Sequence, residues 1–316
     1  MKILISEVIW NEGIESISED GVYIEYDKDL WKKREELLEK VADCDALIVR
    51  NQTRVDQDLL AHATNLKVVG RLGVGLDNID LNQTQERNIK VVAAKNANAT
   101  SVAEYVLSAI LDFNRPLAKA NEDVKKGNWN RQLHTGKEVK GKTLGLIGLG
   151  EISHRVANRA QTFGIEVMGY DPFVTNYDHV IDESGVKKAE SLSDVLTYSD
   201  FISLHVPLTS HTKYMISYEA FNKMKPQSII INSSRGGIID EEALYEAIRD
   251  NKIAGAYLDV LEKEPIEKES PLLILPNIVI TPHIAGLTEE SQVRTSILVA
   301  NEVMNILKGE GSLCLV

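Results

Sequence analysis

The chain has 316 residues, of which 43% are hydrophobic and 26% charged, and its formal net charge is −12. This length favours two domains, each with its own hydrophobic core. The negative charge argues against nucleic acid or an anionic membrane surface as a partner, because both attract basic residues. Cys44 and Cys314 have no metal-ligand spacing, Met1 begins no secretory signal, and no apolar run reaches the roughly 18 residues of a membrane span. We therefore expect a cytoplasmic protein that has no metal site.

The first 97 residues or so alternate short apolar strands with helices, a pattern that predicts a parallel sheet. In such sheets ligands bind beyond the carboxyl ends of the strands. A long helix with a wide apolar stripe follows and breaks at Arg115-Pro116, which suits a buried helix between domains. The expected strands span 2–6, 22–26, 46–50, 66–71 and 90–94, and the clearest helices span 31–41, 56–63 and 101–114.

The central motif of the chain spans 142–171. An apolar strand turns through Gly148 and Gly150 into a helix, and a second strand ends at Asp171. The glycines allow a tight turn and a close approach of the backbone to a pyrophosphate, which the helix N-terminus attracts. Asp171 would accept hydrogen bonds from a ribose diol and repel a 2′-phosphate, so the motif predicts NAD rather than NADP. Ser153 replaces the third glycine, where we expect a small obstruction to helix packing.

The remaining strands of this half are expected over 201–205, 228–232, 254–260 and 278–281, and a last helix over 288–308 ends at Gly309. Two helices show an apolar stripe. The expected stripe of the helix after the glycine turn is Ile152, Val156, Ala160 and Phe163, and that of the last helix is Val293, Ile297, Ala300, Met304 and Leu307.

Three strand ends in the second half offer a cation, a carboxylate and an imidazole. They are 232–237, which contains Arg235; 259–265, which contains several acids; and 281–286, which contains His283. Reduction of a keto carbon by a nicotinamide needs a proton donor for the forming alkoxide, and a histidine beside a carboxylate supplies one near neutral pH. An arginine can hold the substrate carboxylate.

Other polar strand ends leave alternatives open. His205 follows an apolar strand, where a structural role, a place in the cofactor wall and catalysis are all consistent with the sequence. The histidines in polar segments are expected at the surface: His62, His134, His154, His179 and His211. In the first half, Arg50-Asn51 and the Gly73-Val74-Gly75 loop follow strands and can present positive charge and backbone N–H groups to an anion, with Arg54 and Arg71 as auxiliaries.

As an ordered set, these motifs resemble the D-isomer-specific 2-hydroxyacid dehydrogenase family over nearly the whole chain. The segments that carry the resemblance are 71–80, 101–104, 141–150, 204–209, 232–236 and 281–286. The resemblance implies two Rossmann-like, doubly wound parallel-sheet domains with the active site in the cleft between them. It places the substrate domain at 1–97 plus 284–316 and the NAD domain at 98–283. Arg235, Glu264 and His283 become the catalytic trio, which leaves Glu262 as a surface residue.

Within the family, Arg50, Asn51, Gly73, Val74 and Gly75 resemble substrate-contacting positions of the phosphoglycerate dehydrogenases. We therefore expect a small acid with a second anionic group, with sulfolactate, glycerate and lactate as alternatives, and a homodimer. The sequence ends at Val316 without the regulatory domain of the larger members, so serine feedback is not expected. An NAD-sensing corepressor is the alternative class. The remaining expected cofactor contacts are Glu151, Ile152, His205, Pro207, Thr212, Ser233, Asp259 and Gly286.

Overall fold

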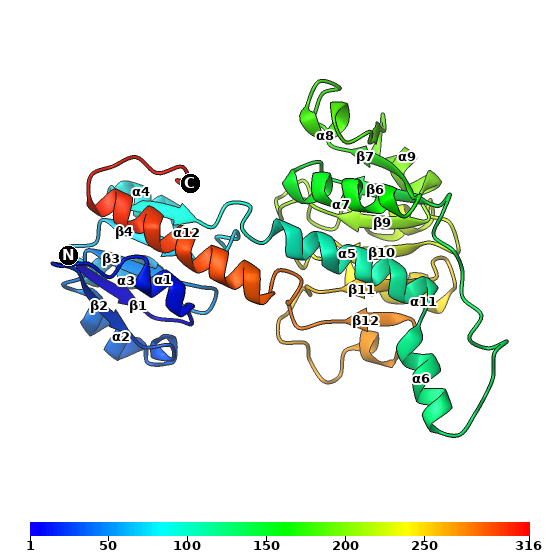
Figure 1. Cartoon of the computed structure of the whole chain (residues 1–316), viewed down its shortest axis with the longest axis horizontal. Coiled ribbons are helices and arrows are strands. Elements are labelled where there is room, and N and C mark those ends of the chain that lie inside the picture. The colour runs from blue at the N-terminus through cyan, green and yellow to red at the C-terminus, as the bar shows by residue number, and fades with distance from the viewer. The chain divides into compact units, whose positions relative to one another are not determined.

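The computed structural model describes residues 1–316, which form two compact units. The first unit comprises Met1–Asn98 and Leu287–Val316, and the second comprises Ala99–Gly286. Each unit is built on one parallel β-sheet that carries helices on both faces (Figure 1). The expected α/β class with two Rossmann-like sheets is confirmed. No helix in the structure is long and apolar enough to cross a membrane.

The sheet of the first unit has five parallel strands in the order β2-β1-β3-β4-β5. The chain order reverses at β1 and β3, so this pair is the switch point at which open α/β sheets bind ligands. The strands are β1 (Lys2–Ile5), β2 (Tyr23–Tyr26), β3 (Ala46–Val49), β4 (Val68–Arg71) and β5 (Lys90–Ala93). All five expected strands are therefore present.

Helices cover both faces of this sheet. One face packs against α2 (Arg34–Val41), α3 (Gln57–His62) and the neighbouring α4 (Leu81–Glu86), and a short 3-10 helix (Leu30–Lys32) precedes α2. The other face packs against α1 (Asn11–Glu15) and the last helix, α12 (Glu289–Leu307). The chain therefore returns to the first unit through α12 after completing the second unit (Figure 1).

The buried face of α12 differs from the predicted apolar stripe. Val293 and Ile297 are only partly buried, whereas the polar Ser296 is almost fully buried. A Cβ atom on Gly13 of α1 would lie 2.7 Å from Ser296 Cβ, so the two helices are in direct backbone contact at this point. Close packing against α1 favours small side chains there. Helix α12 therefore buries Ser296 more fully than the larger apolar residues Val293 and Ile297.

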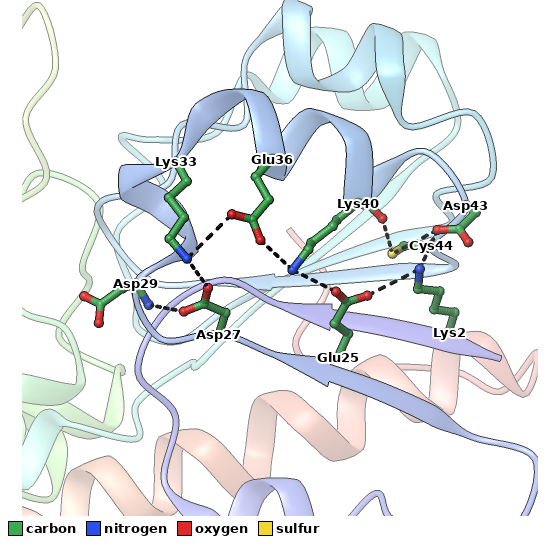
Figure 2. Close-up of polar contacts among 9 residues, drawn as sticks. All are labelled: Lys2, Glu25, Asp27, Asp29, Lys33, Glu36, Lys40, Asp43 and Cys44. Atoms are coloured by element: carbon green, nitrogen blue, oxygen red, sulfur yellow. Dashed lines mark hydrogen bonds and ion pairs between the residues drawn. The ribbon is translucent and has the colours of Figure 1, made fainter.

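Charged side chains bridge the outer part of this sheet and α2 (Figure 2). Lys40 Nζ lies 3.0 Å from Glu25 and 2.8 Å from Glu36, and Lys2 Nζ lies 3.4 Å from Glu25 and 2.7 Å from Asp43. Glu36 and Glu25 raise the pKa of Lys40, and Glu36 contributes most. Because β2 is an edge strand, the charges also discourage pairing with another strand.

The sheet of the second unit has seven parallel strands in the order β12-β11-β10-β9-β6-β7-β8. Its switch point lies between β6 and β9, where the chain turns from one half of the sheet to the other. The strands are β6 (Thr143–Ile147), β7 (Glu166–Tyr170), β8 (Lys187–Lys188), β9 (Phe201–Leu204), β10 (Ile229–Asn232), β11 (Gly255–Leu258) and β12 (Ile278–Ile280).

Alternate residues of these strands face opposite cores. Leu146 and Ile231 point into the core shared with α5 (Ala99–Asn114), α7 (Glu151–Thr162) and α8 (His179–Asp182). Ile147 and Ile230 point into the core shared with α9 (Leu192–Tyr198), α10 (Tyr218–Phe221), α11 (Glu241–Arg249) and the 3-10 helix Pro271–Ile274. Phe163, expected in the buried stripe of α7, lies just beyond the helix end and is 45% exposed.

Candidate active site

The turn between β6 and α7 has the geometry that the glycine motif predicts. Gly148 has φ +88°, and a Cβ atom there would lie 2.4 Å from the carbonyl oxygen of His205. A side chain at Gly148 would therefore force β6 and β9 apart at the switch point. Gly150 is the N-cap of α7, and a Cβ atom built on it meets nothing within 4 Å. The space beside the N-cap of this 12-residue helix is therefore open, which suits a phosphate at the helix N-terminus.

Ser153 does not obstruct this turn. The residue is fully buried, and its hydroxyl donates a hydrogen bond of 2.5 Å to the carbonyl oxygen of Gly148. The serine therefore adds a bond between the helix and the loop, which corrects the expected obstruction.

Asp171 lies directly after β7 and holds the same loop. Its Oδ2 atom accepts the N–H of Leu149 at 2.9 Å, and its Oδ1 atom accepts the N–H of Phe173 at 2.9 Å. Each carboxylate oxygen has a second lone pair for a ligand hydroxyl. The carboxylate is thereby fixed beside the glycine turn.

Buried polar atoms without a hydrogen-bond partner follow β9 and β10. They are Nδ1 of His205 and Oγ of Ser233, and the last residues of the two strands, Leu204 and Asn232, are paired in the sheet. Burial lowers the pKa of His205 to about 4, which favours the neutral imidazole. Of the alternatives for His205, this favours a place in a ligand-lining wall. Buried polar atoms usually have a hydrogen-bond partner, so both atoms are candidates for contact with a ligand.

The other expected cofactor contacts lie near this edge of the sheet or on α7. Glu151 accepts a hydrogen bond of 2.7 Å from Arg155 Nε in the first turn of α7, and Ile152 is partly buried beside it. The hydroxyl of Thr212 donates to the carbonyl oxygen of Pro207 at 2.6 Å and closes the loop after β9. Gly286 is the last residue of the second unit.

His283 and Glu264 form a direct pair. His283 Nδ1 lies 2.8 Å from Glu264 Oε2, and both side chains are partly exposed. His283 has φ +57°, in the left-handed region that residues other than glycine seldom adopt, with asparagine, aspartate and histidine the most frequent exceptions. Burial tends to raise the pKa of Glu264, but hydrogen bonds from His283 and from the N–H of Leu261 hold it below its usual value. The Glu264 carboxylate therefore stays ionised beside the imidazole.

Arg235 lies in the loop after β10, close to this pair. Its positive charge helps to lower the pKa of Glu264, and its Nη1 atom donates to the carbonyl oxygen of Ser234 at 2.6 Å. The next residue is Gly236, where a Cβ atom would lie 1.8 Å from the carbonyl oxygen of Leu261. This contact presses the Arg235 loop directly against the loop that carries Glu264.

Asp259 organises the loop that carries His283. It is 1% exposed, and its carboxylate accepts the N–H groups of Ile284 and Ala285, both at 2.7 Å. It also accepts the hydroxyl of Thr281 at 2.6 Å. Asp259, predicted as a cofactor contact, therefore also supports the His283 loop.

Glu262 is exposed, as expected of a surface residue. Its carboxylate accepts the N–H of Glu241 at 3.1 Å and the hydroxyl of Tyr214 at 3.0 Å, so it ties its loop to α11. His134, expected at the surface, has a side chain only 19% exposed, and its Nε2 atom lies 3.0 Å from Asp123. His154 packs against His179, with 5.1 Å between ring centroids.

In the first unit, Glu7 holds the loop of residues 50–53 at the switch point. Glu7 is 3% exposed, and its carboxylate accepts the N–H groups of all four loop residues. The Arg50 guanidinium is hydrogen-bonded to Gln292 of α12. Burial lowers the pKa of Arg50, although the charge of Glu7 opposes this, and arginine still remains charged. Sequence reasoning missed Glu7 and Gln292, because neither lies near Arg50 in the chain.

The Gly73-Val74-Gly75 loop follows β4. Gly73 has φ +150°, and a Cβ atom there would lie 1.5 Å from Nη1 of Arg71. The Arg71 side chain therefore occupies the space beside Gly73, and a larger residue at that position would displace it. Val74 is 47% exposed at the tip of the loop.

The glycine turn, the terminal acid of β7 and the switch point of the second sheet define a dinucleotide-binding α/β protein. Comparison with known families makes this more specific. Residues 107–285 match the family model described as D-isomer specific 2-hydroxyacid dehydrogenase, NAD binding domain. The chain belongs to this family, and its cofactor is NAD(H).

Similar proteins cover both units. A D-3-phosphoglycerate dehydrogenase from Methanocaldococcus jannaschii is 42% identical over 98% of this chain, which spans only 58% of that relative. An (S)-sulfolactate dehydrogenase from Chromohalobacter salexigens is 44% identical over 96% of this chain and 98% of its own length. A crystal structure of a protein from Thermus thermophilus has a TM-score of 0.91 and 30% identity, with both chains fully covered.

Proposed function

We propose that the protein is an NAD-dependent oxidoreductase that interconverts a D-2-hydroxy acid and its 2-keto acid. The observation that carries this proposal is the His283–Glu264 pair, with 2.8 Å between Nδ1 and Oε2. The pair lies in the unit that contains the residues matched as an NAD-binding domain. A histidine held beside an ionised carboxylate is the proton donor that this reaction needs.

Each member of the proposed trio has one task. In the reducing direction His283 donates a proton to the forming alkoxide, and Glu264 stabilises the imidazolium until the proton leaves. Arg235 holds the carboxylate beside the reacting carbon through charge-assisted hydrogen bonds. The nicotinamide cofactor supplies the hydride. The loops after β9 and β10 hold the cofactor through groups such as His205 and Ser233.

The first unit is proposed as the substrate domain, with a substrate that carries a second anionic group. Arg50 lies at the switch point of the first sheet, and its loop N–H groups are all bound by Glu7. An anion must therefore be bound by side chains of this loop, of which the Arg50 guanidinium carries the positive charge. Asn51 and the 73–75 loop are proposed as further substrate contacts. Phosphoglycerate and sulfolactate, named for two relatives, both have a second anionic group.

We also propose a homodimer in the cytoplasm. Helix α6 (Leu117–Lys125) has no buried residue, and large apolar side chains on it and after it are exposed. Leu117 is 69% exposed, Trp129 79% and Leu133 68%, and such a group of apolar side chains favours burial against a second copy. Both cysteines are free and buried, as is usual in a reducing compartment.

Steady-state oxidation of NADH tests the proposed function. The substrates are phosphohydroxypyruvate, sulfopyruvate, hydroxypyruvate and pyruvate, and we expect one of the first two to have the highest kcat/KM. A higher kcat/KM for hydroxypyruvate or pyruvate would contradict the proposal that the substrate is doubly anionic. It would still support the proposed reaction. NADH binding without turnover of any keto acid would favour a cofactor-sensing protein.

Asp171 should enforce the choice of NADH over NADPH. A carboxylate accepts hydrogen bonds from the ribose diol and repels a 2′-phosphate, so kcat/KM should be higher with NADH. We expect Asp171→Ala to lower the ratio of kcat/KM with NADH to kcat/KM with NADPH by at least about tenfold, which corresponds to roughly 1.4 kcal/mol.

Asp171→Asn separates charge from loop support, because it keeps the size of the side chain and one acceptor. It should narrow the ratio while retaining more activity with NADH than Asp171→Ala. A wild-type preference for NADPH would contradict the assigned role of Asp171.

A further inference from the structure

A pair of hydroxyl groups links α5 to the loop that carries His283. Tyr105 Oη lies 2.8 Å from Oγ1 of Thr281, and Thr281 Oγ1 lies 2.6 Å from Oδ1 of Asp259. Asp259 is buried, and the Thr281 hydroxyl donates to its carboxylate, which is a hydrogen-bond acceptor. The single hydroxyl hydrogen of Thr281 therefore points to Asp259, and Tyr105 must donate to Thr281. The chain of donors runs in one direction, from Tyr105 through Thr281 to Asp259.

The same carboxylate fixes the backbone on both sides of His283. Asp259 accepts the N–H groups of Ile284 and Ala285, both at 2.7 Å, while its carbonyl oxygen accepts the N–H of His283 at 3.0 Å. These bonds hold His283 in its left-handed conformation, φ +57°, which would otherwise be unfavourable. The imidazole then reaches Glu264 at 2.8 Å.

Tyr105 is suited to donate its hydrogen bond to Thr281 at every working pH. Burial raises its pKa to about 12, so the hydroxyl retains its hydrogen throughout the working range of pH. Charged groups near the His283–Glu264 pair include Asp259, Arg235, Glu241 and Glu262. None of these bonds directly to Tyr105 in the contacts above, so Tyr105 acts on the pair only through Thr281 and Asp259.

We infer that Tyr105 and Thr281 are positioning residues that hold the His283 imidazole against Glu264. The inference rests on the proposed proton-donor role of His283. Neither hydroxyl needs to touch the substrate. Their effect reaches the reaction through the conformation of the 281–285 loop.

Isosteric variants test this inference. Tyr105→Phe and Thr281→Val each remove one hydrogen bond, and we expect kcat to fall about 3- to 10-fold, the usual effect of such a bond. KM for NADH should change by less than about twofold. The alkaline limb of the pH profile for keto-acid reduction should move to lower pH, because a misplaced imidazolium interacts less with Glu264. Thr281→Ser, which keeps the hydroxyl, should restore most of the activity.

Tyr257→Phe is the matched control. The hydroxyl of Tyr257 on β11 donates to Asp112 of α5 at 2.7 Å, so it also joins α5 to the sheet, but it has no bond to the 281–285 loop. Thermal unfolding should show similar losses of stability for Tyr105→Phe and Tyr257→Phe. Only Tyr105→Phe should move the pH profile.

A combined variant gives the sharpest result. If Tyr105 acts through the His283–Glu264 pair, adding Tyr105→Phe to Glu264→Gln should move the pH limb no further. The inference is overturned if Tyr105→Phe leaves the profile unchanged, or if it raises KM for NADH without lowering kcat. Full turnover by His283→Ala would instead defeat the proposed role of His283 itself.

Discussion

Replacement of His283 by alanine should lower kcat for keto-acid reduction by about 100-fold or more. General acid–base catalysis contributes roughly 10² to 10⁴ to a rate, and no other imidazole pairs with Glu264 in the structure. NADH binding, measured by fluorescence titration, should remain, because the glycine turn and Asp171 are unchanged. His211→Ala is a suitable control, since His211 is exposed in the loop after β9. A loss of less than about tenfold would exclude His283 as the proton donor.

Glu264→Gln should be milder and should change the pH dependence. The pKa of Glu264 is lower than usual, so the carboxylate is ionised at ordinary pH. Glutamine removes this negative charge from beside the His283 imidazole. The alkaline limb of the reduction profile should therefore move to lower pH. An unchanged profile would remove Glu264 from the proposed role.

Arg50→Ala should raise KM for the doubly anionic substrate by about tenfold or more. A hydrogen bond to a charged group is worth about 1.5–3 kcal/mol, which corresponds to roughly 10- to 100-fold in affinity. The KM for pyruvate, which has no second anionic group, should change far less. An equal effect on all four keto acids would make Arg50 a structural residue.

Two further variants sharpen the Arg50 experiment. Arg87→Ala is the charge-matched control, because Arg87 is exposed in the same unit and donates to the carbonyl oxygen of Leu60. Gln292→Leu removes the hydrogen-bond partner of the Arg50 guanidinium, while Arg50 keeps its positive charge. It should give a smaller rise in KM in the same direction.

The sequence predicted those features that depend on local patterns. The strand–turn–helix around Gly148 and Gly150 has a regular apolar period, and the structure places it at the switch point of the second sheet. The tendency of ligands to bind beyond the carboxyl ends of parallel strands likewise pointed to His283. Its spatial pairing with Glu264 came from family resemblance, because 19 residues separate His283 from Glu264 and no local pattern connects them.

Features that depend on distant contacts were missed. Glu7 bonds to a loop 43 or more residues away, and Gln292 meets Arg50 across 242 residues. The buried face of α12 was misplaced because close contact with Gly13 selects small polar residues such as Ser296 rather than the most apolar stripe. Helix α1 has only five residues, which is too few for an apolar period to show.

The return of α12 has a consequence for folding during synthesis. A Cβ atom on Gly70 of β4 would lie 2.6 Å from Val303 and 2.8 Å from Val299, so α12 covers the backbone of the first sheet directly. The second unit is one continuous segment, Ala99–Gly286, and the whole of it emerges from the ribosome before α12 does. One face of the N-terminal sheet therefore stays exposed to solvent until the second unit has emerged. The first unit cannot be completed as it is synthesised, and its sheet needs protection from aggregation until α12 packs onto it.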